Sequence, residues 1–172
     1  TVNGYLGTDG IAPLLKVCAQ KDAGIFVLAK TSNPSSGEFQ DQMLHAMYEP
    51  LYRAMGNMCQ IWGKELPGRY GYTGVGAVVG ATYPKQLAEL RQALPDTFFL
   101  VPGYGTQGGG AEDVAPAFDR FGGGAVVNSS RAILCAWQKE NCEPADYAGA
   151  ARREAIRMRD EIVARLGGIS LP

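Results

Sequence analysis

Short apolar runs, rich in β-branched and aromatic residues, alternate with longer segments of helical spacing along this chain of 172 residues. Most of these runs are almost continuously apolar, a pattern typical of strands that are buried on both faces of a sheet. The pattern predicts five strands, at Thr1–Asn3, Gly24–Lys30, Val75–Gly80, Thr97–Val101 and Gly124–Asn128.

Helical patterns fill the intervals between the predicted strands. Thr8 or Asp9 can cap a first helix. The longest pattern runs from Phe39 to Trp62, with methionines interpreted as core residues, and Pro50 is expected to kink it or split it in two. The only histidine, His45, falls within this pattern and is interpreted as a helix residue, not a catalytic base. Further helices are predicted at Pro84–Leu94, Glu112–Phe121 and Ala145–Leu166.

Strands and helices that alternate at this spacing predict βαβ units and a parallel sheet. No linker or change in composition divides the chain, so residues 1–172 are expected to form a single domain. Two α/β architectures fit: a five-stranded doubly wound domain, or the C-terminal part of a (β/α)₈ barrel, which typically takes about 250 residues.

Composition narrows the classes of function. Apolar residues make up 46% of the chain and charged residues 19%, as in a globular protein. The net charge is −1 and the basic residues are dispersed, which argues against nucleic acid or a membrane as the main partner. The four cysteines form no C-x-x-C pair and one histidine adds few ligands, so we expect reduced thiols in a cytoplasmic protein and no metal site.

Small and polar residues follow all five predicted strands. In parallel α/β folds, the carboxyl ends of the strands form the rim that binds the ligand. Turns favour the same residue types for conformational reasons, but the shared character of all five strand ends favours a ligand site.

The loop after the fourth predicted strand has the sequence VPGYGTQGGG, which contains G-x-G-x-x-G. A dinucleotide fingerprint needs a helix that begins within the glycines and an acidic residue at the end of the next strand. Here the helical pattern begins later and the next strand ends in Asn128. No Lys-Ser/Thr follows the glycines either, which excludes a Walker A loop. Gln107 remains as the hydrogen-bonding side chain of this loop.

An arginine follows the fifth predicted strand, in the segment Ser129-Ser130-Arg131. A guanidinium suits bidentate contact with a phosphate. In (β/α)₈ barrels the common phosphate site lies after strands 7 and 8, so these last two strand ends predict a phosphate site.

Five segments resemble orotidine 5′-phosphate decarboxylases, particularly their longer bacterial subgroup: TVNGYLGTD, VLAKTSNPSSGEFQ, GAVVGATYP, LVPGYGTQGGG and VVNSSRAI. They occur in the family's order and spacing across nearly the whole chain. The resemblance implies a TIM barrel, usually a homodimer, that converts orotidine 5′-phosphate to UMP without a metal or organic cofactor. Gly4 departs from the proline expected in this subgroup.

The resemblance also implies roles for individual residues. Ser32 resembles the serine that hydrogen-bonds the pyrimidine ring, and Gln107 the residue that closes over the phosphate. Arg131 resembles the phosphate-binding arginine, beside the backbone N–H groups of Ser130 and of Arg131 itself. Pro102 and Tyr104 are expected to wall the base pocket.

The family's catalytic motif, Asp-x-Lys-x-x-Asp, does not occur in this sequence. Lys30 ends a predicted strand, but the family's catalytic lysine comes from a different segment. We therefore expect this chain to correspond to about strands 4–8 of the barrel, to hold no catalytic residue and to be inactive alone. The alternative is a non-catalytic module that binds phosphates or nucleotides. The sequence encoded upstream of Thr1 discriminates between the two.

Overall fold

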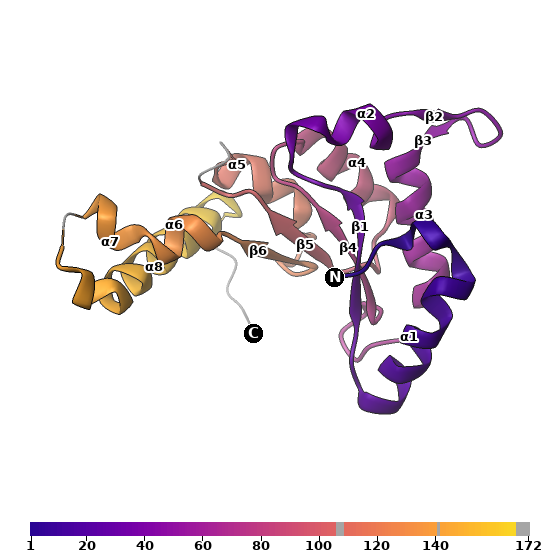
Figure 1. The fold of residues 1–172 in the computed structure, drawn as a ribbon, viewed down its shortest axis with the longest axis horizontal. Helices are drawn as coiled ribbons and strands as arrows, with labels where there is room; N and C mark the ends of the chain where they lie inside the picture. Colours follow the sequence, from indigo (N-terminus) through magenta and orange to yellow (C-terminus); the bar gives the residue numbers. More distant parts are fainter. Residues whose placement is uncertain (106–108, 141, 168–172) are drawn as a thin grey trace.

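The computed structural model describes residues 1–105, 109–140 and 142–167. A parallel sheet of four strands, in the order β1-β4-β5-β6, forms the centre of the fold (Figure 1). These strands are β1 (Ile25–Lys30), β4 (Val75–Val79), β5 (Phe99–Pro102) and β6 (Ala125–Asn128). The predicted parallel α/β sheet is therefore confirmed.

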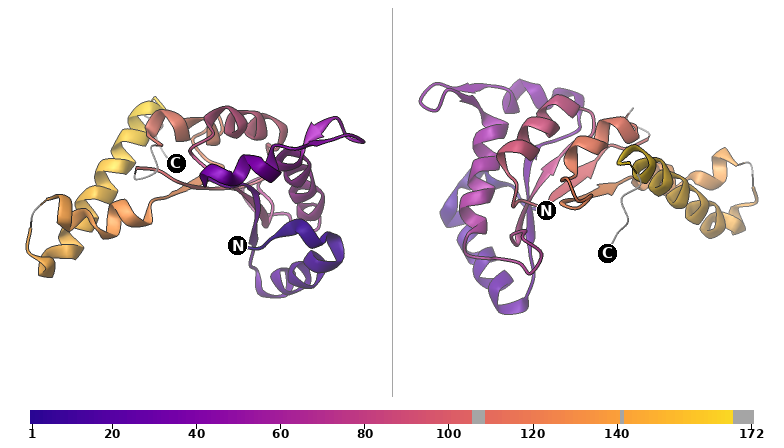
Figure 2. Two further views of the ribbon diagram at one scale, coloured as in Figure 1. Left: turned by 45° about the horizontal axis from the view of Figure 1, so that its top comes forward. Right: turned by 180° about the vertical axis from the view of Figure 1, so that it is seen from behind.

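The longer helices follow one another in an arc around the sheet (Figure 2). The α-helices are α1 (Thr8–Lys21), α2 (Gly37–Gln40), α3 (Leu51–Gly63), α4 (Pro84–Ala93), α5 (Ala111–Val114), α6 (Ser130–Leu134), α7 (Ala136–Lys139) and α8 (Tyr147–Arg165). Short 3₁₀ turns are η1 (Gly4–Leu6), η2 (Pro34–Ser36), η3 (Ala115–Ala117) and η4 (Pro144–Asp146).

The first predicted strand is reduced to one bridging residue. Val2 lies parallel to β1, where its N–H donates to the carbonyl of Phe26 at 2.8 Å and its carbonyl accepts from the N–H of Leu28 at 3.0 Å. The side chain of Asn3 then accepts a hydrogen bond from the N–H of Tyr5 and caps η1. This cap turns the chain away from the sheet directly after Val2.

The predicted helix from Phe39 to Trp62 is wrong in its first half. Between α2 and α3 the chain forms an antiparallel hairpin, β2 (Met43–Leu44) and β3 (Glu49–Pro50). The expected split at Pro50 is confirmed, because proline disfavours helical geometry in the residue before it and α3 starts directly after it. His45 therefore lies in the turn of this hairpin and not in a helix. Met43 and Met47 are exposed, whereas Met55 and Met58 pack against the core as expected.

The predicted helix Glu112–Phe121 is also shorter than expected. The α-helical part ends at Val114, and η3 follows it. Pro116 has no N–H to donate to the preceding turn, which accounts for the early end of α5. Phe118 is already extended, with φ −85° and ψ 149°.

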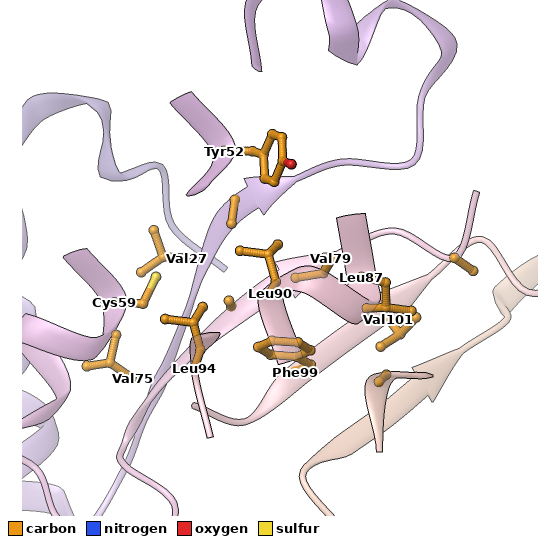
Figure 3. Close-up of a cluster of buried hydrophobic side chains, with 14 of the residues drawn as sticks. Val27, Tyr52, Cys59, Val75, Val79, Leu87, Leu90, Leu94, Phe99 and Val101 are labelled. Carbon is orange, nitrogen blue, oxygen red and sulfur yellow. The ribbon is translucent and has the colours of Figure 1, made fainter. Parts of the chain in front are cut away.

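The main core lies between the sheet and the helices. Figure 3 shows Val79 and Phe99 of the strands beside Leu87 and Leu90 of α4, with Val27 of β1 next to Cys59. Trp62 of α3 is buried in the same cluster, and its indole N–H donates to Thr8 Oγ1 at 3.0 Å. This contact fastens the start of α1 to α3.

The other face of the sheet is less covered than the sequence predicted. All five residues of β4 are buried, but β5 alternates between buried and half-buried positions and β6 between half-buried and exposed ones. Leu28 is 36% exposed and Val126 is 45% exposed. Burial on both faces is therefore confirmed along β4 alone among the described strands.

Leu90→Ala should destabilise the fold, because Leu90 is fully buried between α4 and the sheet. We expect the free energy of unfolding in urea to fall by about 2–5 kcal/mol, the usual cost of removing a buried leucine side chain. Leu134→Ala makes the same change at a position that is 64% exposed, and should cost less than about 0.5 kcal/mol. Equal losses in the two variants would contradict this placement of the core.

Candidate functional site

A cavity of about 190 Å³ lies at the carboxyl ends of β5 and β6. Its lining residues are Ser32, Pro102, Gly103, Tyr104, Asn128, Ser129, Ser130 and Arg131. Five of the six residues proposed from the sequence to bind substrate are in this set. The sixth, Gln107, lies outside the described residues. Three segments that are far apart in the sequence therefore meet at the predicted edge of the sheet.

The register of the sheet brings two of these segments level with each other. Pro102 at the end of β5 is paired with Asn128 at the end of β6. Directly beyond this pair, the Ser129 hydroxyl donates to the backbone carbonyl of Tyr104 at 2.8 Å, in a buried position. This hydrogen bond fixes the two strand ends to each other.

The glycine-rich loop is closed at its base by backbone contacts. Tyr104 and Gly109 form a parallel bridge, and the Gly105 N–H donates to the Gly109 carbonyl at 2.8 Å. Gly105 has a φ of 83°, and a β-carbon there would lie 3.3 Å from Cβ of Ala132 in α6. The two ends of the loop are therefore hydrogen-bonded to each other, and they pack against the helix that carries Arg131.

Ser32 reaches the same cavity from the loop after β1. A β-carbon on Gly80, at the end of β4, would lie only 2.7 Å from Cα of Ser32, so the two backbones make close contact. The Thr82 hydroxyl donates to the Ser32 carbonyl at 3.1 Å. Within the described part of the chain, the Ser32 hydroxyl itself makes no hydrogen bond and is available to a ligand.

The side chain of Tyr104 is held by the last helix. Its ring is 3% exposed, and its hydroxyl donates to Glu161 of α8 at 2.8 Å. Burial and this hydrogen bond raise the pKa of Tyr104 to about 12. Arg157, one turn before Glu161, forms an ion pair with that glutamate. No sequence pattern indicates this role of Glu161, because it lies 57 residues from Tyr104 on an otherwise ordinary charged helix face.

Arg131 is exposed in the first turn of α6. None of the ion pairs among the described residues involves its guanidinium. Its charge is therefore available to an anion at the cavity.

Other classes of site find less support. Within residues 1–105, 109–140 and 142–167, no three His, Cys, Asp or Glu side chains come together in a way that could hold a metal ion. No described helix has the length and apolar character to cross a membrane. All four cysteines are free thiols. His45 makes an edge-to-face contact with Tyr48 within the hairpin.

These features fit part of a (β/α)₈ barrel with a cavity at the carboxyl ends of its strands. The family model described as Orotidine 5′-phosphate decarboxylase / HUMPS family matches residues 1–141, and the chain belongs to this family. The resemblance and fold class inferred from the sequence are thereby confirmed.

Relatives at both the sequence and the structural level are similar over most of this chain. It is 44% identical to the orotidine 5′-phosphate decarboxylase of Rhodopirellula baltica, over 94% of this chain and 54% of the relative. It is 48% identical to the orotidine 5′-phosphate decarboxylase of Caldicellulosiruptor bescii, over 80% of this chain and 45% of that relative. The structure of Leishmania donovani UMP synthase matches with a TM-score of 0.73 and 31% identity, over 94% of this chain and 32% of that one. The chain spans about half the length of the curated relatives it matches.

The raised pKa of Tyr104 predicts a pH dependence of stability. The folded chain keeps the phenol proton up to about pH 12, whereas the unfolded chain loses it near the ordinary value of 10.0. The stabilisation that Tyr104 contributes should therefore be fully present below pH 10. As the pH rises from 10 to 12, the free energy of unfolding should fall by up to about 1.4 kcal/mol per pH unit.

Tyr104→Phe should remove this part of the slope when urea unfolding is measured across that pH range. Tyr70→Phe is the matched control, because Tyr70 is 87% exposed, and it should keep the wild-type slope. The same slope in both variants would show that burial and the contact with Glu161 do not raise the pKa of Tyr104.

Proposed function

We propose that this chain is the phosphate- and pyrimidine-binding part of an orotidine 5′-phosphate decarboxylase, and that the whole protein makes UMP in pyrimidine biosynthesis. The observation that carries the proposal is the single cavity that joins Ser32, Pro102 and Arg131 in a chain of this family. Each comes from a different segment, and together they offer a hydroxyl, an apolar wall and a cation.

Arg131 is assigned to the phosphate in this proposal, with the backbone N–H groups of Ser130 and Arg131 beside it. Ser32 is assigned to the pyrimidine, Pro102 and Tyr104 to the wall of the base pocket, and Gln107 to the loop that closes over the phosphate. The cavity of about 190 Å³ is smaller than the ~300 Å³ at which ligand pockets usually begin, so it suits part of a nucleotide and not the whole.

The proposal assigns the chemical step to a motif that this sequence lacks. Loss of CO₂ from C6 leaves a carbanion with no neighbouring carbonyl to accept the charge, so the reaction needs electrostatic stabilisation and a proton donor. The resemblance assigns both to Asp-x-Lys-x-x-Asp, which is absent here. The part proposed for this chain is to grip the phosphate, because binding energy remote from the reacting carbon can drive loop closure and order the site.

The proposal extends to the state of the whole protein. On the family resemblance, we propose a cytoplasmic homodimer that acts on a small-molecule substrate without a cofactor. The net charge of −1 and the dispersed basic residues favour this over nucleic acid or a membrane as partner.

Arg131→Ala should weaken the binding of UMP to the chain by about 10- to 100-fold, the usual worth of a charge-assisted contact. Binding of uridine, which lacks the phosphate, should change less than about twofold. Isothermal titration of both ligands measures the two effects. Arg152→Ala removes the same charge from an exposed position on α8 and should change neither affinity. Equal weakening of UMP and uridine would remove Arg131 from the phosphate site.

The chain of 172 residues should not decarboxylate orotidine 5′-phosphate by itself, because its sequence lacks the Asp-x-Lys-x-x-Asp motif to which the resemblance assigns the proton donor. The test is release of CO₂ from labelled substrate, with the chain purified from a host that lacks its own decarboxylase. Turnover above that of a mock purification would overturn the assignment of all catalytic groups to residues outside this chain.

A further inference from the structure

Lys30, the last residue of β1, is completely buried and is the largest fully buried side chain of the described residues. Lysine is almost never fully buried unless its charge is paired, because removal of an ammonium group from water is costly. Its Nζ donates to Asp41 Oδ1 at 2.8 Å and to Ser36 Oγ at 3.1 Å. The ring of Tyr83 lies beneath it, with the centroid 4.2 Å from Nζ.

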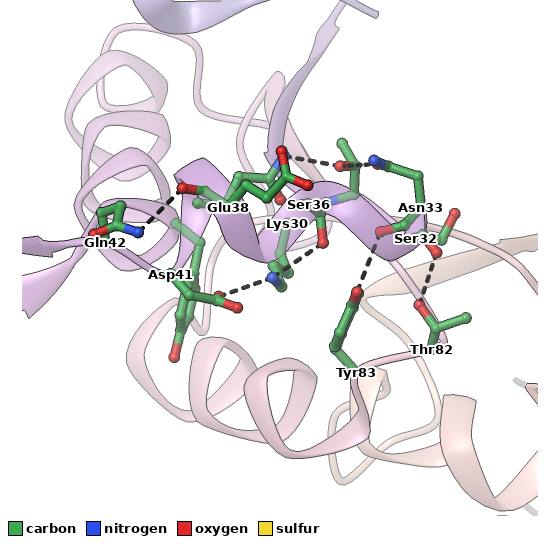
Figure 4. A network of polar contacts seen from close by, with 12 residues as sticks. Lys30, Ser32, Asn33, Ser36, Glu38, Asp41, Gln42, Thr82 and Tyr83 are labelled. Atoms are coloured by element: carbon green, nitrogen blue, oxygen red, sulfur yellow. Dashed lines mark hydrogen bonds and ion pairs between the residues drawn. The ribbon is translucent and has the colours of Figure 1, made fainter.

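These contacts span the loop that carries Ser32. Lys30 precedes Ser32 in the chain, and both hydrogen-bond acceptors of its ammonium follow it, at Ser36 and Asp41 (Figure 4). The Lys30 backbone is itself fixed, because its carbonyl accepts from the Gly80 N–H at 2.7 Å. The side chain therefore ties the far end of the loop back to the edge of the sheet.

The neighbours of Ser32 on both sides are held in the same way. The Tyr83 hydroxyl, on the ring that contacts Lys30, donates to the carbonyl of Asn33 at 3.1 Å. On the other side, Gln40 accepts from the Thr31 N–H at 2.9 Å and donates to the Thr31 hydroxyl at 2.8 Å. The Ser32 backbone is fixed from both directions, while its hydroxyl is left for a ligand.

We infer that Lys30 is a positioning residue that sets the preference of the site for a pyrimidine base, because it holds the loop from which Ser32 reaches the cavity. The inference rests on the proposed function in one respect, the assignment of Ser32 to the base. Lys30 does not line the cavity, and the phosphate residues Ser130 and Arg131 stand on a different strand end. Loss of the Lys30 contacts should therefore affect recognition of the base and spare recognition of the phosphate.

The test compares two probes, UMP and ribose 5-phosphate, which share the sugar phosphate and differ in the base. Titration of the wild-type chain gives the ratio of their affinities. Lys30→Met keeps an unbranched side chain and removes the donor, and should lower that ratio about tenfold with ribose 5-phosphate affinity unchanged. Lys85→Met makes the same change on the exposed side of α4 and should leave the ratio at its wild-type value.

Ser36→Ala removes one acceptor and leaves the ion pair with Asp41 intact, and should lower the ratio about threefold. It decides the question where Lys30→Met does not fold. The inference is overturned if a folded Lys30→Met chain keeps the wild-type affinity ratio or binds both probes more weakly to the same degree. If Lys30→Met does not fold, the same two results in Ser36→Ala overturn it. If the wild-type chain binds UMP no better than ribose 5-phosphate, the proposed role of Ser32 in binding the base is contradicted instead. If only Arg131→Ala weakens the binding of both UMP and ribose 5-phosphate, the proposed phosphate site is supported independently of Lys30.

Discussion

The parallel register between β5 and β6 is the constraint on which the site depends. Because Pro102 is paired with Asn128, the two strands end at the same level, and the residues that follow them emerge side by side. A shift of one residue would exchange the two faces of β6. The Ser129 hydroxyl could then no longer reach the Tyr104 carbonyl in its buried position. Strand pairing thus sets the position of the cavity, whichever side chains line it.

Two polar contacts, each between one buried and one partly exposed side chain, then orient the loops beyond the strands. Lys30 fixes the loop after β1 through Ser36 and Asp41, and Glu161 fixes the start of the loop after β5 through the Tyr104 hydroxyl. The ion pair of the buried Lys30 with the partly exposed Asp41 adds little net stability, because desolvation of the lysine offsets much of the attraction between the charges. Its directional contacts are better explained by the geometry they impose on Ser32 than by a contribution to the free energy of unfolding.

The sequence was sufficient for the features that depend on local pattern and chain order. Apolar runs located the four strands, and the polar residues after them located the rim where Ser32, Pro102 and Arg131 meet. It was insufficient where distant residues or competing local conformations decide the outcome. The chain is split at Pro50 as expected, but apolar spacing does not indicate that the residues before it form a hairpin instead of a helix. Lys30 and Glu161 were missed because their roles are defined by side-chain contacts and not by a motif.

The side chains that orient the cavity residues lie in the layer between the sheet and the helices. Lys30 is buried against Tyr83 beside α4, and Tyr104 is anchored to α8. By contrast, Leu28 and Val126 leave part of the sheet's other face open. The contacts that position Ser32 and the strand ends therefore do not pass through the open face. The groups that orient the cavity residues therefore lie within this chain, which spans about half the length of its relatives.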